Sequence, residues 1–418
     1  MRANPCNAVA VLWDESHLWG LLLWRALEAF GVPAILARAG DMPALLDRKP
    51  RLLLVPGGWA RGKAERLGCE GLAAVRRYVA DGGAYLGFCG GAGLALTHGG
   101  LDLCPWTRKG FTDRLQHFVS GHMRANLSAE RGGLVPESLP EQPLLPVWWP
   151  ARFNPEPSPG VSVLAAYDSP GSDLMVADIP LASLPDETLD DWQNLYGVRL
   201  WPHFMAGQPC VVASRLGSGR AVLSYAHLET PASRAANAWL AHLVAHLSGL
   251  EALNAPVPAW DLESLPVHWD DPALAETSER LADIVRLGQE HFLLFWRNPW
   301  LLGWRRGIPG AGITSLYALV RQIRACAPTD AASAYWRAQA AEFARVMELF
   351  HKGVTGYLLA ERLAMTLASA PDAVCLTGLK QQKSALFGPP PSSGGLYGRL
   401  LPVLEELARL ILPCDAGA

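Results

Sequence analysis

The sequence lacks the features that identify several common classes of protein. Its eight cysteines are scattered, with no C-x-x-C pair and no cysteine–histidine cluster, so neither a zinc site nor a disulfide framework is indicated. The net charge is −3, which gives no general attraction to nucleic acid or to an anionic membrane. No stretch reaches about 18 apolar residues without a charge, so we expect no transmembrane helix.

A signal peptide pattern is also missing, because Asp14, Glu15 and Arg25 interrupt the apolar residues near the N-terminus. Thiols without a disulfide pattern are typical of a reducing compartment, so we expect a cytoplasmic protein. Nothing in the sequence indicates a metal ion or another cofactor. Half of the 418 residues are hydrophobic, and at about 150 residues per domain the length predicts two or three domains.

Strands and helices alternate along the first part of the chain. The patterns predict strands at Ala8–Trp13, Ala34–Ala37, Leu52–Val55 and Ala84–Phe88, and helices at His17–Phe30 and Glu70–Ala80. This alternation is typical of an α/β fold with a parallel sheet covered by helices on both faces. The working site of such a sheet lies beyond the carboxyl ends of its strands.

Cys89 lies between a predicted strand and a predicted helix, in the sequence GAYLGFCGGAGLAL. The pentapeptide GFCGG is a G-x-C-x-G form of the nucleophile elbow, a sharp turn that exposes a nucleophile above the sheet. Its glycines allow backbone segments to approach closely. The helix N-terminus favours the thiolate, which is the reactive form of cysteine. A buried structural cysteine in a glycine-rich turn is the alternative.

A glycine pair, Gly57-Gly58, follows the third predicted strand. Acyl chemistry needs two N–H groups to hold the developing oxyanion. Gly90, the residue after Cys89, would supply one, and Gly58 is the natural source of the other, so the two segments should lie close together. Gly57 and Trp59 are candidates for substrate binding. An ordinary turn at the end of a strand is the alternative.

His227 and Glu229 follow a predicted strand at Arg220–Tyr225, the second half of a hairpin. A histidine there can take the thiol proton, and a carboxylate can orient the imidazole. Residues i and i+2 point the same way in extended backbone. Because H-x-E alone is common in solvated turns, its significance depends on the elbow and the glycine pair.

The region between these motifs has weaker patterns. We expect a strand at Phe118–Leu127 with Ser120, His122 and Arg124 on one side. The proline-rich segment Pro136–Pro159 is expected to be a loop.

The segments VPGGW, YLGFCGGAGLAL and GSGRAVLSYAHLETP resemble, in this order, the class I glutamine amidotransferase-like superfamily. More narrowly, residues 1–255 resemble the amidotransferase-like N-terminal domain of biotin–protein ligases and its stand-alone bacterial form. The resemblance implies a flavodoxin-like three-layer sandwich with a mostly parallel sheet. It also implies that Cys89 is the nucleophile, His227 the base and Glu229 its orienting partner, with an oxyanion hole at Gly58 and Gly90.

The chain departs from these relatives in several ways. It has none of the extended glutamine-binding motifs, no glycine- and arginine-rich biotinyl-AMP loop and no synthetase domain, so we do not expect a biotin ligase. In the related intracellular-protease branch a carboxylate at the position of Asp14 or Glu15 contacts the cysteine. A helix-capping acidic pair is the alternative here, and the favoured one.

The remaining residues, 256–418, follow a proline-containing linker at Gly249–Trp269 and are expected to form an all-α helical bundle of no recognised family. Helices are predicted at Ala273–Trp296, Ile313–Ala325, Ala331–Phe350, Val354–Ala368 and Leu400–Leu412. Pro371–Gly395 is expected to be a loop or tether.

Within this half, Phe292–Arg306 mixes three tryptophans with three arginines. It could be a membrane-surface segment, a docking patch for the first domain or the rim of a lid over Cys89. An aromatic core helix broken at Pro299, with its arginines reaching outward, is the favoured interpretation.

Three functions remain open at this stage. The first is thiol-mediated hydrolysis or transfer at an amide or related acyl group of a small molecule, through a thioester at Cys89. The second is a catalytically silent module that binds a ligand, or a protein partner through the helical half. The third is an accessory protein at a membrane surface. We expect no nucleic acid partner and no membrane contact.

Overall fold

The computed structural model describes residues 8–109, 119–129, 133–185, 187–197, 205–253, 256–367, 376–389 and 394–412. These residues fall into two compact units, one extending to Ala259 and the other spanning Trp260–Pro413. The domain boundary predicted at residue 255 lies outside the described residues.

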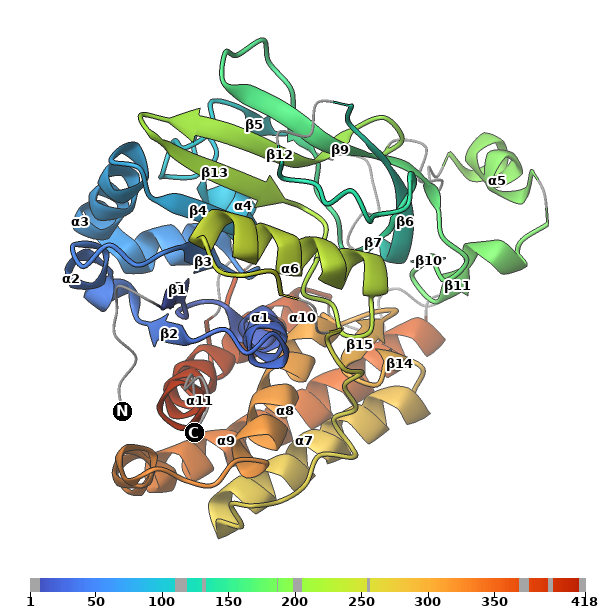
Figure 1. Ribbon diagram of the computed structural model, residues 1–418. Coiled ribbons are helices and arrows are strands. Elements are labelled where there is room, and N and C mark those ends of the chain that lie inside the picture. The colour runs from blue at the N-terminus through green and yellow to red at the C-terminus, as the bar shows by residue number, and fades with distance from the viewer. Residues whose placement is uncertain are drawn as a thin grey trace. The chain divides into compact units, whose positions relative to one another are not determined.

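One half of the sheet in the first unit is parallel (Figure 1). It contains β1 (Val9–Leu12), β2 (Ala34–Ala37), β3 (Leu53–Val55), β4 (Ala84–Phe88) and β13 (Gly219–Ser224), in the order β2-β1-β3-β4-β13. These short strands form where the chain is apolar and bounded by turn residues, and the strands predicted in these places are confirmed. Their carboxyl ends carry the segments that begin at Trp13, Pro56, Cys89 and Tyr225.

The sheet continues beyond β13 with antiparallel strands. These are β12 (Pro209–Leu216), β9 (Val161–Pro170), β6 (Val119–Leu127), β10 (Met175–Val176) and β11 (Ile179–Pro180), while β7 (Leu144–Trp148) pairs with β6. A separate small sheet joins β5 (Thr107–Arg108) to β8 (Phe153–Asn154). The strand predicted around His122 is confirmed from Val119 onward, whereas Phe118 lies outside the described residues.

The loop predicted at Pro136–Pro159 is wrong, because β7 lies within it. Four of its five residues are buried, although Pro146 stands in the middle of the strand. Proline is tolerated in a strand that pairs on one side, and among the described strands β7 pairs with β6 alone.

The first unit also contains α-helices. They are α1 (His17–Ala29), α2 (Met42–Leu46), α3 (Ala60–Ala80), α4 (Gly90–Leu94), α5 (Thr188–Tyr196) and α6 (Arg234–Ser248). Of these, α5 lies apart from the sheet (Figure 1). The helix predicted from Glu70 is the second part of α3, which begins ten residues earlier and bends at Gly68, where φ is 60°. The chain also makes short 3-10 turns at Ala39–Asp41 and Leu181–Ser183.

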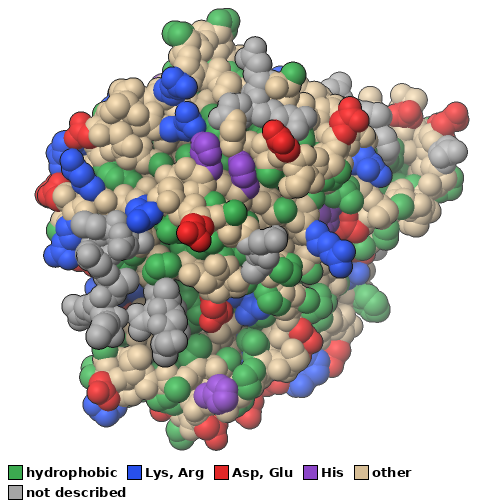
Figure 2. Space-filling model, in the orientation of Figure 1, with side chains coloured by type: hydrophobic (Ala, Val, Ile, Leu, Met, Phe, Trp, Pro, Cys, Tyr) green, Lys and Arg blue, Asp and Glu red, His purple; other side chains and the backbone are tan. Residues whose placement is uncertain are grey.

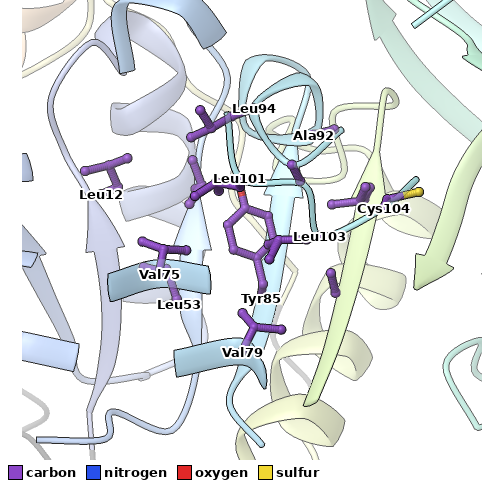
Figure 3. Packing of buried hydrophobic residues seen from close by; sticks show 14 of the residues in the cluster. Leu12, Leu53, Val75, Val79, Tyr85, Ala92, Leu94, Leu101, Leu103 and Cys104 are labelled. Atoms are coloured by element: carbon purple, nitrogen blue, oxygen red, sulfur yellow. The ribbon is translucent and has the colours of Figure 1, made fainter. Parts of the chain in front are cut away.

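Tyr85 lies at the centre of the apolar cluster between the parallel strands and helices α2, α3 and α4 (Figure 3). Around it are Leu12, Leu53, Val75 and Leu94. The buried hydroxyl of Tyr85 donates a hydrogen bond of 2.6 Å to the carbonyl oxygen of Gly91. This bond ties the core directly to the turn that carries Cys89.

The second unit is largely helical. Its helices are α7 (Pro272–Glu290), α8 (Gly310–Arg324), α9 (Asp330–Thr366), α10 (Leu376–Phe387) and α11 (Tyr397–Ile411). The two helices predicted on either side of residue 352 are one continuous α9, and α10 lies within the segment predicted to be a loop or tether. Residues 368–375 and 390–393 of these predicted segments lie outside the described residues.

The all-α prediction for this unit is wrong in one place, because β14 (Leu294–Asn298) and β15 (Leu301–Trp304) form an antiparallel hairpin. The predicted helix ends at Glu290 instead of Trp296. Phe292 has a φ of 58°, which an α-helix cannot accommodate, and Pro299 falls in the turn between the strands.

Acidic and basic side chains are interspersed on the face shown in Figure 2, as expected for a net charge of −3. Among the described residues, no helix combines the length and the apolar character needed to cross a bilayer.

Candidate active site

Cys89 occupies the turn between β4 and α4 with a φ of 45° and a ψ of −101°. A non-glycine residue in this region of backbone space costs roughly 1–3 kcal/mol, and such strain is common at functional sites. The turn is held in place because the N–H of Cys89 donates to the carbonyl oxygen of Ser224 at 2.8 Å, from the neighbouring strand β13. The residue is partly exposed and forms no disulfide.

The turn at Cys89 packs directly against the Gly57-Gly58 loop. A Cβ atom on Gly90 would lie 2.1 Å from the carbonyl oxygen of Gly58, and one on Gly91 would lie 2.1 Å from that of Val55. Neither position can hold a side chain. The predicted proximity of the glycine loop to the elbow is therefore confirmed.

Gly58 is constrained from a second side. Its φ is 106°, and an added Cβ would lie 2.0 Å from the carbonyl oxygen of Glu15. Within the part of the chain that the structure describes, no hydrogen bond uses the backbone N–H of Gly58 or of Gly90.

His227 and Glu229 lie in the turn after β13, and their side chains are in direct contact. Nδ1 of His227 is 2.8 Å from Oε1 of Glu229, and both residues are fully buried. The turn is fixed by Asn237 from α6, whose Nδ2 donates to the carbonyl oxygens of Leu228 and Thr230, each at 2.9 Å. Nε2 of His227 and Oε2 of Glu229 are buried without a hydrogen-bond partner among the described residues.

The charge state of His227 reflects its neighbours. Burial by itself lowers the pKa of the imidazole, but the charge of Glu229, the Cys89 thiol and the hydrogen bond to Glu229 outweigh this and raise the pKa to about 10. The ring is therefore protonated at neutral pH. Since Glu229 holds Nδ1, the thiol is left to interact with the Nε2 side of the ring.

Trp19 lies beside His227, a contact that the sequence did not reveal. Its indole stacks on the imidazole of His227, with ring centroids 4.3 Å apart, and meets Trp149 edge-on at 5.9 Å. A Cβ on Gly57 would lie 2.7 Å from Cγ of Trp19. The signal available in the sequence was its position, in the first turn of the helix that follows β1.

Trp59, in contrast, is the N-cap residue of α3 and is 45% exposed. It differs in this from Trp19, which packs on His227.

Tyr225 is a second residue that sequence reasoning missed. Its hydroxyl is buried and has no hydrogen-bond partner among the described residues. Burial raises the pKa of this hydroxyl. The charge of Arg108 acts against this increase, and Cys89 adds to it. Tyr225 lies directly after β13, two residues before His227, and interacts electrostatically with Cys89.

Asp14 and Glu15 take part in other contacts. Oδ2 of Asp14 accepts the N–H of Ala39 at 2.6 Å, which joins the ends of β1 and β2. Glu15 has a φ of 56°, and its Oε1 lies 3.4 Å from Nε of Arg66. The favoured prediction that this acidic pair caps α1 is wrong, since neither residue lies in its first turn and its N-cap, Ser16, makes no side-chain capping bond.

Among the described residues, no group of three or more potential ligands could hold a metal ion.

Comparison with known proteins gives one match to a family. Residues 46–98, which include Gly58 and Cys89, match the family described as "Biotin-protein ligase, N terminal". The resemblance predicted from the sequence is thus confirmed for this segment, whereas His227 and Glu229 lie outside it. No curated protein matches the chain.

Several solved structures are distantly similar. A GMP synthase subunit protein from Thermoplasma acidophilum is 13% identical over 58% of this chain and 94% of its own, with a TM-score of 0.38. A β-galactosidase from Bacillus circulans sp. alkalophilus is 14% identical over 59% of this chain and 32% of its own, with a TM-score of 0.35. A ThuA-like protein from Bacteroides uniformis is 11% identical over 58% and 93%, with a TM-score of 0.35. Similarities of this size support no inference about activity.

Proposed function

We propose that the first unit is a flavodoxin-like, glutamine amidotransferase-like enzyme that hydrolyses or transfers an amide or related acyl group of a small molecule through Cys89, His227 and Glu229. The observation that carries the proposal is the state of His227. One ring nitrogen is held by a buried carboxylate at 2.8 Å, and the other, which has no nitrogen or oxygen partner among the described residues, is left to the Cys89 thiol, whose interaction with the ring helps to raise the pKa of His227.

The chemistry follows from this arrangement. The sulfur of Cys89 attacks the carbonyl carbon of the substrate, and the developing oxyanion accepts the N–H groups of Gly58 and Gly90. The protonated His227 then gives its proton to the departing nitrogen, and the C–N bond breaks to leave a thioester. Water activated by His227 hydrolyses the thioester, while Glu229 keeps the ring oriented.

A second candidate is a catalytically silent module that binds a ligand beside Cys89. The observation that favours it is the enclosure of His227, whose side chain is 0% exposed and stacked beneath Trp19. Cys89 is partly exposed, whereas Trp19 packs against the imidazole.

Trapping of the thioester distinguishes the two candidates. We expect the full chain, incubated with L-glutamine and other small primary amides, to release ammonia and to form an acyl adduct on Cys89 that hydroxylamine removes. Cys89→Ala is the control and should abolish both signals. Ligand-induced stabilisation without ammonia release or an adduct would instead support the silent module.

A further inference from the structure

A second group of chemically related side chains lies outside the Cys89 site. His122 on β6 contacts Asp173, from the turn after β9, and Ser233, at the start of α6. Nδ1 of His122 lies 2.9 Å from Oδ2 of Asp173, and Nε2 lies 3.1 Å from Oγ of Ser233. The sequence placed His122 on a strand but gave no indication of its partners.

Asp173 fixes the orientation and the tautomer of this imidazole. Its second oxygen, Oδ1, accepts the backbone N–H of His122 at 3.0 Å, so both carboxylate oxygens engage the same residue. An ionised carboxylate only accepts hydrogen bonds, so Nδ1 of the neutral ring carries the proton. Nε2 is then the acceptor for the hydroxyl of Ser233, as it is in a Ser–His–Asp triad.

The turn that carries Asp173 is built against His122. The N–H of Gly171 donates to the carbonyl oxygen of His122 at 2.8 Å. A Cβ on Gly171 would lie 2.7 Å from that oxygen, so a glycine is needed for this approach. The position of Asp173 is thus determined by the backbone as well as by its side chain.

Ser233 is the N-cap residue of α6 but does not cap the helix. A serine at this position usually accepts an N–H from the first turn, yet α6 has no side-chain capping bond and the hydroxyl is instead directed to His122. The first bond of the helix runs from the N–H of Asn237 to the carbonyl oxygen of Ser233 at 2.8 Å. The N–H groups of the three residues between them therefore have no partner inside the helix.

The backbone before Ser233 is also strained. Ala232 has a φ of 59°, in the left-handed region that alanine rarely adopts. Strained backbone of this kind is found preferentially at functional sites.

We propose that Ser233, His122 and Asp173 form a second, serine-based hydrolytic site that acts on a small carboxylic ester. Oγ of Ser233 attacks the ester carbonyl carbon while Nε2 of His122 takes the hydroxyl proton, and the free N–H groups of α6 stabilise the oxyanion. The ester C–O bond breaks, and the alcohol leaves with the proton from His122.

Deacylation completes the reaction. Water gives a proton to His122 and adds to the acyl carbon, the bond to Oγ breaks, and the proton returns to Ser233 as the carboxylic acid leaves. Water reaches the site from the side of His122 and Asp173, whose side chains are 23% and 42% exposed, whereas Ser233 is 7% exposed. An ester suits such a site better than an amide, because an alcohol is the better leaving group.

The test uses the full chain carrying Cys89→Ala, so that the thiol site does not contribute. We expect a fluorophosphonate probe to form one adduct, located on Ser233 by peptide mass mapping, with loss of fluoride. We also expect hydrolysis of p-nitrophenyl acetate that falls by about 100-fold or more in Ser233→Ala, the usual scale for loss of such catalysis.

Variants of the other two residues separate catalysis from folding. His122→Ala and Asp173→Asn should each slow the labelling of Ser233 by at least about 10-fold, and the asparagine is nearly isosteric with the native residue. Ser218→Ala is the matched control, because Ser218 is an exposed serine whose hydroxyl bonds the carbonyl oxygen of Ala80, and it should change neither signal. Absence of an adduct on Ser233, an adduct on another serine instead, or labelling that Asp173→Asn leaves unchanged would overturn the proposal.

Discussion

Nδ1 of His227 lies 2.8 Å from Oε1 of Glu229, and both side chains are completely buried. A buried carboxylate beside an imidazole is stable when the pair shares a proton and the charges balance. The His227–Glu229 pair therefore holds a proton inside the first unit, near Cys89. This property can be measured without knowledge of the substrate.

The stability of the protein should depend on this proton. The pKa of His227 is raised from 6.5 to about 10 in the folded chain, so protonation favours folding. The contribution is complete below a pH of about 6.5 and is lost as the pH rises toward about 10. We expect the free energy of unfolding, measured with urea across this range, to fall with rising pH.

The variant His227→Gln should remove that part of the pH dependence. His242→Gln serves as the control, because the His242 ring contacts the carbonyl oxygen of Gly133 near the surface. Parallel profiles for the native protein and His227→Gln would show that the buried ring does not hold the proton.

Cys89 should be the most reactive thiol of the chain. Near a pH of about 6.5, where an unperturbed thiol reacts slowly, we expect iodoacetamide to modify Cys89 first, because the protonated His227 stabilises negative charge on the sulfur. His227→Ala should slow the reaction strongly, and Glu229→Gln should slow it less. Peptide mass mapping identifies the modified residues.

Two cysteines serve as internal controls for this reaction. Cys69 is exposed and tests whether access alone suffices, whereas Cys210 is buried and has a raised thiol pKa as a result. Equal rates at Cys89 and Cys69, together with no effect of His227→Ala, would contradict the triad and favour the silent module.

The parallel half of the fold could be predicted because its signals are local. Ala34–Ala37 and Ala84–Phe88 are apolar runs bounded by turn residues, and both strands have the predicted limits. The candidate site was equally accessible, since Cys89, Gly58 and His227 lie in short motifs at strand ends. Prediction from local patterns failed where the structure depends on a contact between residues that are distant in sequence. The pairing of β7 with β6, the packing of Trp19 on His227 and the link from His122 to Ser233 all join residues that are twenty or more positions apart.

The hairpin of the second unit was not predicted, for a different reason. The run from His291 to Arg306 alternates large apolar residues with arginines, and such a run fits a broken helix as well as a pair of strands. The positive φ of Phe292 decides the outcome, and a phenylalanine gives no indication of it.

Residues 292–306 should not bind membranes. Arg306 forms a 2.6 Å ion pair with Glu361, and the guanidinium of Arg305 lies 4.8 Å from the centre of the Phe295 ring. Both arginines thus make contacts within the unit, and Trp300 is buried. We expect no co-sedimentation with anionic liposomes at low salt. Strong binding that Arg305→Glu with Arg306→Glu abolishes, and that Arg286→Glu on α7 does not, would contradict this.

The two units should be separable by a protease. The segment 249–269 contains three prolines, and its described residues, 249–253 and 256–269, are mostly exposed and form no helix or strand. Exposed segments of this kind are preferred sites of cleavage. Limited proteolysis of the native chain should yield fragments that end in this segment or near Gly388, and each should resist further digestion. First cleavage within residues 52–96 would show that the division is wrong.

The close packing of the glycine loop gives the most direct test of the site geometry. Gly58→Ala combines a φ of 106° with a Cβ placed 2.0 Å from the carbonyl oxygen of Glu15, so strain and overpacking together should destabilise the first unit by roughly 3–5 kcal/mol. Gly31→Ala is the matched control, since its φ is 66° and nothing lies within 4 Å of the added atom. It should cost about 1–2 kcal/mol through strain alone. Urea unfolding measures both variants. Equal losses would mean that the Glu15 carbonyl can move aside, and then the position of the Gly58 N–H beside Cys89 would not be fixed by packing.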